Sequence, residues 1–376
     1  TMESSPLLPA ESSATGRSPS PSRRAATQTV HPEFDAADPD AALVPGDGDY
    51  DFQAPPVLGD LPRHLGLIDL VCIGVGGTVG SGIFVLCGLI ARDYAGPATF
   101  LSWAAAGLAA CLSGFCCAEL SGKIPEAGSA YAYAAVTIGE YGSFVAASCL
   151  TLNYVGSASA VARSWGDKVA HWSAADLGVD HWLSRTLDPG YGVNPAAFLV
   201  SAGSVFLLLW GVQESKFATN LFTVLKVGLV IFMIVVGMGL VDADNFEPLV
   251  PPEFGVAGVF RGATSCFFGY IGFDEACCLA GEAIDPQRNM PRAVLWTIGI
   301  TTLLYMFAAT VLVGMQPYAD ISGESGFPDA FRANGVEWAA QIASAGEVIT
   351  LPIVVLISIL AQPRLQWAVA KDGLLP

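Results

Sequence analysis

The chain has 376 residues, of which 53% are hydrophobic and only 14% are charged, and its mean hydropathy is +0.52. A soluble domain usually carries about a quarter charged residues, so this composition excludes an ordinary soluble protein and favours a polytopic helical membrane protein. The formal net charge of −17 argues against a nucleic-acid partner.

Residues 1–57 are rich in Ser, Pro, Ala and Asp and show no apolar periodicity. Such a segment cannot bury enough apolar surface to offset the entropy of ordering, so we predict a disordered cytoplasmic tail. The acidic dileucine pattern Glu3–Leu8 is of the kind that sorting adaptors bind, but a pattern this short also arises by chance.

Residues 58–376 form the predicted transmembrane domain, with eight apolar spans in an all-α polytopic fold. Each span is long enough to cross a hydrocarbon layer about 30 Å thick, since a helix rises about 1.5 Å per residue. We place the spans near residues 65–90, 98–119, 139–162, 195–212, 217–240, 258–281, 293–315 and 338–362.

The basic residues predict the orientation of these spans. With the N-terminus in the cytoplasm, the inner segments carry more Lys and Arg than the outer ones, as the positive-inside rule requires. The inner residues are Arg17, Arg23, Arg24, Arg63, Lys123, Lys216, Arg288, Arg292, Arg364 and Lys371, and the outer ones are Arg92, Arg163, Lys168, Arg185 and Arg332. The sequence allows either the plasma membrane or a vacuolar or lysosomal membrane.

The first span contains a cluster of glycines between Gly74 and Gly88. Glycine costs up to about 1 kcal/mol relative to alanine inside a helix, so the cluster marks a point where the helix can unwind. The N–H groups of Gly80, Ser81 and Gly82 would then begin a new half-helix, whose positive dipole end suits a carboxylate. Close helix packing through small residues is the alternative, and this span alone does not decide between them.

The sixth span is interrupted in a similar way and reads Phe267-Phe-Gly-Tyr-Ile-Gly-Phe-Asp-Glu275. Broken spans at corresponding positions of two halves indicate a transporter with inverted repeats. Free carbonyls near Thr78 and Phe268 would receive an ammonium group, so the two breaks together fit an α-amino acid. Asp274 either contacts this substrate or caps the second half of the broken helix, and both roles stay open.

The cysteines and histidines do not indicate a metal site or an enzyme. All nine cysteines lie in apolar runs without a zinc-type spacing, and the four histidines lie in the tail or in an outer loop. Neither a paired nucleophile and base nor a cofactor motif is present, so we expect no catalytic residues, no metal and no cofactor.

Residues 61–376 resemble the cationic amino-acid transporter branch of the amino acid–polyamine–organocation superfamily. The resemblance follows the family's order along the chain rather than one motif. It is carried by Gly76–Phe84, Ala95–Ala98, Ala118–Tyr131, Gly139-Glu140, Ala160–Trp165, Gly211–Ser215, Asn245-Phe246, Gly272–Asp274, Glu282–Pro291, Pro363-Arg364 and Asp372–Leu375.

The resemblance implies a LeuT-like inverted-repeat fold and transport of cationic or broad-range L-amino acids, by uniport or coupled to protons. The substrate would lie between the first and sixth spans, lined by Thr78, Gly80, Ser81, Gly82, Phe268, Ile271 and Asp274. The resemblance also implies a proton-coupling role for Lys226, for which an ordinary snorkelling lysine is the alternative.

Two positions depart from the family pattern. Asn153 stands where many relatives place a glutamate near the substrate, and Leu351-Pro352 replaces small hydroxyl residues near the ion position. Asn153 lacks the carboxylate that would favour a cationic side chain, so the side-chain preference stays open. Leu351-Pro352 lacks the hydroxyl groups near the ion position, so the coupling mode stays open as well.

The family's core has ten helices, so the second repeat would be truncated here after its third helix. We therefore expect this chain to be a piece of a longer protein that transports poorly by itself. The alternatives are a non-transporting amino-acid sensor and an inactive fragment.

Overall fold

The computed structural model describes residues 63–375 except 81, 127, 176–185, 187–191, 210–215 and 324, and for residues 174, 175 and 216–219 it describes the backbone alone. The chain divides into Thr1–Val57 and Leu58–Pro376, and the described residues all belong to the second unit. The predicted disordered tail and its pattern Glu3–Leu8 therefore lie outside the described residues.

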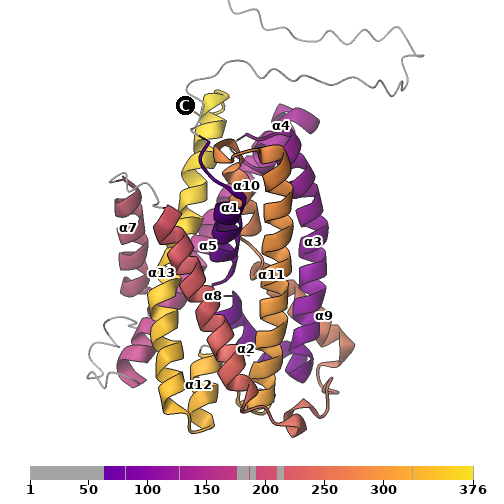
Figure 1. Ribbon diagram of the computed structural model, residues 1–376, viewed down its shortest axis with the longest axis vertical. Coiled ribbons are helices and arrows are strands. Elements are labelled where there is room, and N and C mark those ends of the chain that lie inside the picture. Colours follow the sequence, from indigo (N-terminus) through magenta and orange to yellow (C-terminus); the bar gives the residue numbers. More distant parts are fainter. Residues whose placement is uncertain are drawn as a thin grey trace, which may run out of the picture. The chain divides into compact units, whose positions relative to one another are not determined.

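Within the described residues the secondary structure is helical, apart from one isolated β-bridge between Leu65 and Ala283. The all-α class predicted from the sequence is confirmed. The elements, shown in Figure 1, are α1 (Leu67–Thr78), η1 (Gly82–Leu86), α2 (Cys87–Ile90), η2 (Ala91–Ala95), η3 (Gly96–Ala98), α3 (Thr99–Lys123), α4 (Ala130–Thr137), α5 (Glu140–Ala175), α7 (Pro195–Leu209), α8 (Lys216–Met238), η4 (Ala243–Phe246), α9 (Gly255–Phe268), α10 (Phe273–Cys278), η5 (Ala280–Glu282), α11 (Pro286–Met315), η6 (Tyr318–Asp320), α12 (Gly326–Ala333) and α13 (Glu337–Lys371).

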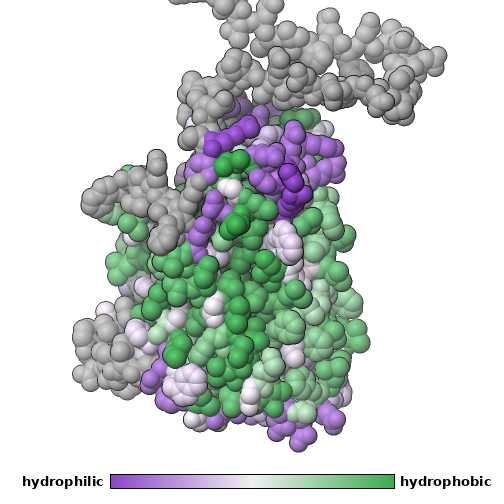
Figure 2. Space-filling model, viewed as in Figure 1, coloured by the Kyte–Doolittle hydropathy of each residue, from purple (hydrophilic) through white to green (hydrophobic). Residues whose placement is uncertain are grey.

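The helical surface is that of a protein embedded in lipid. Figure 2 shows apolar side chains over most of the visible face and polar side chains gathered toward its two ends. On α3, Leu108, Leu112 and Phe115 are exposed at the spacing of one helix face. In the described part of the chain, five stretches are long and apolar enough to cross a membrane, namely Leu67–Lys123, Glu140–Ser173, Asn220–Met238, Pro286–Met315 and Glu337–Lys371.

Helix α1 packs against α8, α10, α11 and α13. Figure 1 shows it between α11 and α13. Its inner face is formed by glycines because neighbouring side chains occupy the space that a Cβ would need. A Cβ at Gly74 would lie 2.5 Å from Thr297 Oγ1 of α11, and one at Gly76 would lie 2.5 Å from Thr223 Oγ1 of α8. Small residues therefore set the close helix spacing around α1.

A side chain of α5 forms a hydrogen bond with α13 one turn before a proline. Pro352 lies inside α13 and has no N–H to donate to the carbonyl four residues earlier, at Val348. The indole Nε1 of Trp165 on α5 donates to that carbonyl instead, at 2.8 Å. The Leu351-Pro352 departure thus creates an interhelical hydrogen bond without ending the helix.

Helix α5 continues well past residue 162, where the sequence placed the end of the third span. Arg163 and Lys168, predicted to lie in an outer segment, are helical residues whose charges are offset locally. Arg163 pairs with Asp167 one turn on, at 3.0 Å, and Lys168 pairs with the buried Glu347 of α13, at 2.5 Å. Offsetting each charge allows the helix to extend beyond its apolar part.

Candidate functional site

Both glycine-rich interruptions predicted from the sequence are breaks in the structure. Helix α1 ends at Thr78, the backbone at Val79 is extended with φ −72° and ψ 102°, and helical structure resumes at Gly82. Helix α9 ends at Phe268, and α10 begins after Gly272, whose φ is +131°. A φ of this value strongly favours glycine, so the second break depends on Gly272.

The two breaks contact each other through backbone. A Cβ at Gly272 would lie 2.7 Å from the Thr78 nitrogen, and a Cβ at Gly82 would lie 2.7 Å from Gly269 Cα. Unwinding and close packing, which the sequence left as alternatives for the first span, therefore occur together. The glycines thus allow the two unwound segments to meet through their backbones.

Tyr305 of α11 connects the two breaks. Its hydroxyl lies 2.7 Å from the carbonyl oxygen of Thr78 and 3.0 Å from that of Gly269, and it donates its one hydrogen to either of them. The ring is fully buried and packs edge-on against Trp103, with centroids 4.5 Å apart. Sequence analysis missed Tyr305, because nothing in the local pattern distinguishes it from other aromatic residues in an apolar span.

The carbonyls of Thr78 and Phe268, near which the sequence predicts the ammonium group, each have a hydrogen-bond partner within the protein. The Thr78 carbonyl accepts from Tyr305, and the Phe268 carbonyl accepts from the N–H of Ile271 at 3.2 Å. Each oxygen retains a second lone pair, since a carbonyl accepts two hydrogen bonds. A bound ammonium group would therefore share these oxygens with groups of the protein.

Replacing Tyr305 with phenylalanine is expected to loosen the contact between the breaks. The loss of one donor from two buried carbonyls should lower the stability of the purified protein by about 1–3 kcal/mol. Thermal unfolding in detergent measures this, with Tyr141→Phe as the control, because the Tyr141 side chain is exposed. Equal unfolding temperatures for the two variants would show that the hydroxyl does not hold the breaks together.

Asp274 interacts with the break that precedes it. Its Oδ1 accepts a hydrogen bond from the N–H of Gly272 at 3.2 Å, so the carboxylate satisfies a backbone donor of the unwound segment. Tyr154 of α5 lies beside α10, with its hydroxyl 3.2 Å from the sulfur of Cys278. The preceding residue, Asn153, is half-buried, and the described part of the structure shows no polar contact between its side chain and α1 or α10.

Lys226 of α8 is fully buried, and its Nζ donates to the carbonyl of Gly76 at 2.6 Å. The snorkelling alternative is therefore wrong, because the ammonium group does not reach an exterior surface. Glu275 of α10 is also buried, and its charge acts on Lys226. A Cβ at Gly77 would lie 2.5 Å from Glu275 Oε2. Lys226 and Glu275 therefore lie against two consecutive residues of α1, Gly76 and Gly77.

Of the residues predicted to line the site, six lie in or next to the two breaks and one lies outside the described residues. The six are Thr78, Gly80, Gly82, Phe268, Ile271 and Asp274, and the one outside is Ser81. Gly80 faces α13, since a Cβ there would lie 3.1 Å from Val354 Cγ1. Lys226 contacts α1 two residues before Thr78, and Asn153 stays a prediction.

Comparison with known proteins gives consistent matches over this region. The sequence profile of the family described as "Amino acid permease" matches residues 65–376. The chain is 38% identical to the vacuolar cationic amino acid transporter 4 of Arabidopsis thaliana, over 84% of this chain and 54% of the relative. It is 37% identical to the methylthioribose transporter and 32% identical to the branched-chain amino acid permease BcaP, both of Bacillus subtilis, over 84% of this chain and 69% of each. The chain thus spans about half the length of the plant relative.

Proposed function

Because the chain belongs to the amino acid permease family, we propose that this multi-pass membrane protein carries L-amino acids and binds them between its two helix breaks. The observation that carries this proposal is the backbone contact of Gly272 with Thr78 and of Gly82 with Gly269. It places the start of the half-helix at Gly82 beside the carbonyls of Thr78 and Gly269.

The two ends of an α-amino acid match the two kinds of backbone group at the breaks. The carboxylate would lie at the N-terminal end of the segment that begins at Gly82, where N–H groups and the helix dipole favour an anion. The ammonium group would lie toward the carbonyls of Thr78 and Gly269, with the carboxylate of Asp274 close to the same break. Cationic or broad-range L-amino acids are our first choice of substrate, because Asp274 adds a carboxylate beside the break and the chain resembles cationic amino acid transporters.

We propose that a set of contacts closes the breaks on the side that we assign to the cytoplasm. Glu282, at the end of η5, accepts from the Arg364 side chain of α13 at 2.9 Å, and its carbonyl accepts from the N–H of Leu65 at 3.0 Å. The N–H of Ile284 donates in turn to the Leu65 carbonyl at 2.8 Å. This closure ties the start of α1 to α13, so a LeuT-like carrier would release it to open toward the cytoplasm.

Replacing Glu282 with glutamine should weaken this closure, because Arg364 would lose the charge of its partner. The variant is expected to expose Cys72 of α1 more often, which an alkylation rate measured from the cytoplasmic side reports. The control is Asp285→Asn, which removes a neighbouring exposed carboxylate. If both variants react at the wild-type rate, the ion pair does not hold the inner side closed. The double variant Glu282→Arg with Arg364→Glu re-forms the ion pair with the charges exchanged, and it should restore the wild-type alkylation rate.

Lys226 is our candidate for coupling transport to protons. The ammonium group contacts α1 next to the break, and its protonation would respond to the water that enters when either side opens. The cytoplasmic N-terminus, and a plasma, vacuolar or lysosomal location, follow from the basic residues and the resemblance and remain proposals.

Uptake into proteoliposomes tests the proposed function. Protein purified after expression of the full-length gene should accumulate radiolabelled L-arginine, L-lysine or L-leucine in a saturable manner, faster when the external solution is more acidic. Binding of the same amino acids without uptake would indicate an amino-acid sensor instead. The absence of both binding and uptake would contradict the proposal.

A further inference from the structure

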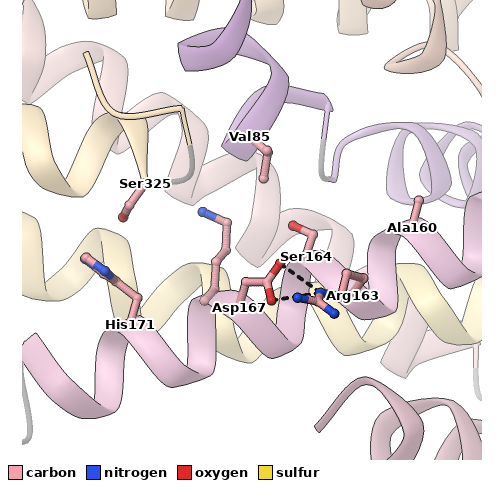
Figure 3. Close-up of a pocket in the computed structure, with 8 residues that line it drawn as sticks. Val85, Ala160, Arg163, Ser164, Asp167, His171 and Ser325 are labelled. Carbon is pink, nitrogen blue, oxygen red and sulfur yellow. Dashed lines mark hydrogen bonds and ion pairs between the residues drawn. The ribbon is translucent and has the colours of Figure 1, made fainter. Parts of the chain in front are cut away.

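The half-helix η1 packs closely on one side and borders a hollow on another. Gly82, its first residue, lies against the second break and against Tyr305, whose hydroxyl would be 3.2 Å from a Cβ at Gly82. Toward α5, by contrast, a hollow of about 280 Å³ lies between Val85 of η1 and the side chains of Ser164 and Asp167 (Figure 3). Packing on this side therefore does not by itself fix the position of η1.

One side chain of α5 reaches η1 directly. The Nζ atom of Lys168 donates to the carbonyl oxygen of Phe84 at 3.1 Å. Phe84 is the third residue of η1, two residues after Gly82, and it is buried. A hydrogen bond from an ammonium group to a carbonyl is charge-assisted and is roughly twice as strong as one between neutral groups. Lys168 therefore links α5 to the half-helix.

The charge of this lysine is neutralised inside the protein. Lys168 is only 6% exposed, and its Nζ lies 2.5 Å from Oε2 of Glu347 on α13, which is 1% exposed. The other carboxylate oxygen of Glu347, Oε1, has no hydrogen-bond partner among the described residues. The lysine is thus the member of the pair that bonds to η1, and the glutamate offsets the cost of burying its charge.

A second contact holds α5 and α13 together one turn away from this pair. Trp165 Nε1 donates to the carbonyl of Val348, the residue after Glu347, at 2.8 Å. Trp165 and Lys168 are three residues apart and so lie on the same face of α5. Without the lysine, α5 and α13 would still be joined through Trp165, whereas η1 would lose its hydrogen bond to α5.

Stability alone does not account for a buried ion pair at this position. Replacing such a pair with apolar side chains of similar volume often leaves a protein equally stable or makes it more stable. A hydrogen bond does fix a distance and a direction, because Nζ must stay within bonding range of the Phe84 carbonyl. That carbonyl belongs to the segment whose first residue, Gly82, would receive the substrate carboxylate.

We infer that Lys168 is a positioning residue for the substrate site: by holding the Phe84 carbonyl, it keeps the start of η1 against the second break, where the carboxylate of an L-amino acid would bind. The inference rests on the proposed function and adds to it a residue outside the two breaks. Glu347 acts only by neutralising the lysine. When the bond to Phe84 is lost, η1 is free to move toward the hollow, and the N–H groups at its start move away from the second break.

Two variants of the full-length protein separate positioning from stability. Lys168→Met with Glu347→Gln removes both charges and the donor to Phe84, so the KM for uptake of L-arginine or L-leucine should rise about tenfold, with little change in the maximal rate. Glu347→Gln alone keeps the lysine, which donates to Phe84 whether or not it is protonated, so the KM should change by less than about threefold. Arg163→Met is the matched control on the same helix, because Arg163 pairs with Asp167 of α5, and its KM should equal that of the wild type.

A cysteine on η1 reports the position of the half-helix without any substrate. Val85 is half-buried and lines the hollow, so Val85→Cys is introduced into a protein whose exposed Cys116 and Cys149 are replaced by serine. Its alkylation rate should rise severalfold when Lys168→Met and Glu347→Gln are combined. It should stay at the wild-type value in Glu347→Gln alone, which controls for lost stability because it leaves the lysine buried without its partner.

The outcomes separate the inference from the function on which it rests. A higher KM and a faster alkylation rate in the double variant, with neither change in Glu347→Gln, support the positioning role. If the two variants behave alike, the ion pair acts only through stability, and the inference is overturned while the proposed function stands. If the wild type neither binds nor transports these amino acids, the proposed function fails, and the alkylation rates alone then decide whether Lys168 holds η1.

Discussion

Replacing Gly272 with alanine is expected to reduce amino-acid uptake to background. The backbone at this residue has a φ of +131°, which side chains with a Cβ rarely adopt, and the new Cβ would lie 2.7 Å from the Thr78 nitrogen and 2.8 Å from the Gly77 carbonyl carbon. These are backbone atoms, so no side chain can turn away to make room. The break before α10 must then separate from the break after α1.

Two control variants separate the causes of this loss. Gly335→Ala introduces a Cβ at φ +73° with nothing within 4 Å, so it tests backbone strain alone, and Gly299→Ala tests a helical glycine with open space around it. Both should transport, and both should reach the membrane in wild-type amounts. Wild-type uptake by Gly272→Ala would mean that the breaks do not have to touch.

Replacing Lys226 with methionine is expected to remove the dependence of uptake on external pH. Methionine keeps an unbranched apolar chain but lacks the ammonium that donates to the Gly76 carbonyl. Uptake at acidic external pH should fall by at least about tenfold, the effect of losing an interaction worth about 1.4 kcal/mol. Initial rates across a pH series measure both changes.

A second substitution separates coupling from folding. Removing the lysine takes away a positive charge that acts on the buried Glu275, so Lys226→Met by itself can destabilise the protein. Lys226→Met with Glu275→Gln removes both charges and should recover the amount of folded protein without recovering pH-dependent uptake. The control Lys123→Met alters an exposed lysine. A Lys226→Met protein that still responds to pH would exclude this lysine as the coupling group.

The glycine clusters made the helix breaks predictable from the sequence. Glycine weakens a helix through its own backbone, so the effect is local and can be read from Gly76–Gly82 and Gly269–Gly272 without knowing the fold. The all-helical class and the family were predictable for a similar reason, since long apolar runs and dense motifs need no long-range information.

The side chains that hold the breaks in place were not predictable, because their partners are far away in the sequence. Tyr305 bonds to Thr78, 227 residues earlier, and Lys168 pairs with Glu347, 179 residues later. Lys168 was placed in an outer segment because a charge usually ends a span. For Lys226 the sequence left two roles open, and only its complete burial excludes snorkelling.

Substrate protection of a cysteine at residue 271 tests most directly whether an amino acid binds between the breaks. Ile271 lies in the unwound segment between α9 and α10 and is half-buried. In a protein whose exposed Cys116 and Cys149 are replaced by serine, the alkylation rate of Ile271→Cys should fall as L-arginine or L-leucine is added, while that of the exposed control Val136→Cys stays constant. A rate at residue 271 that does not change at saturating amino acid would contradict a substrate site between the breaks.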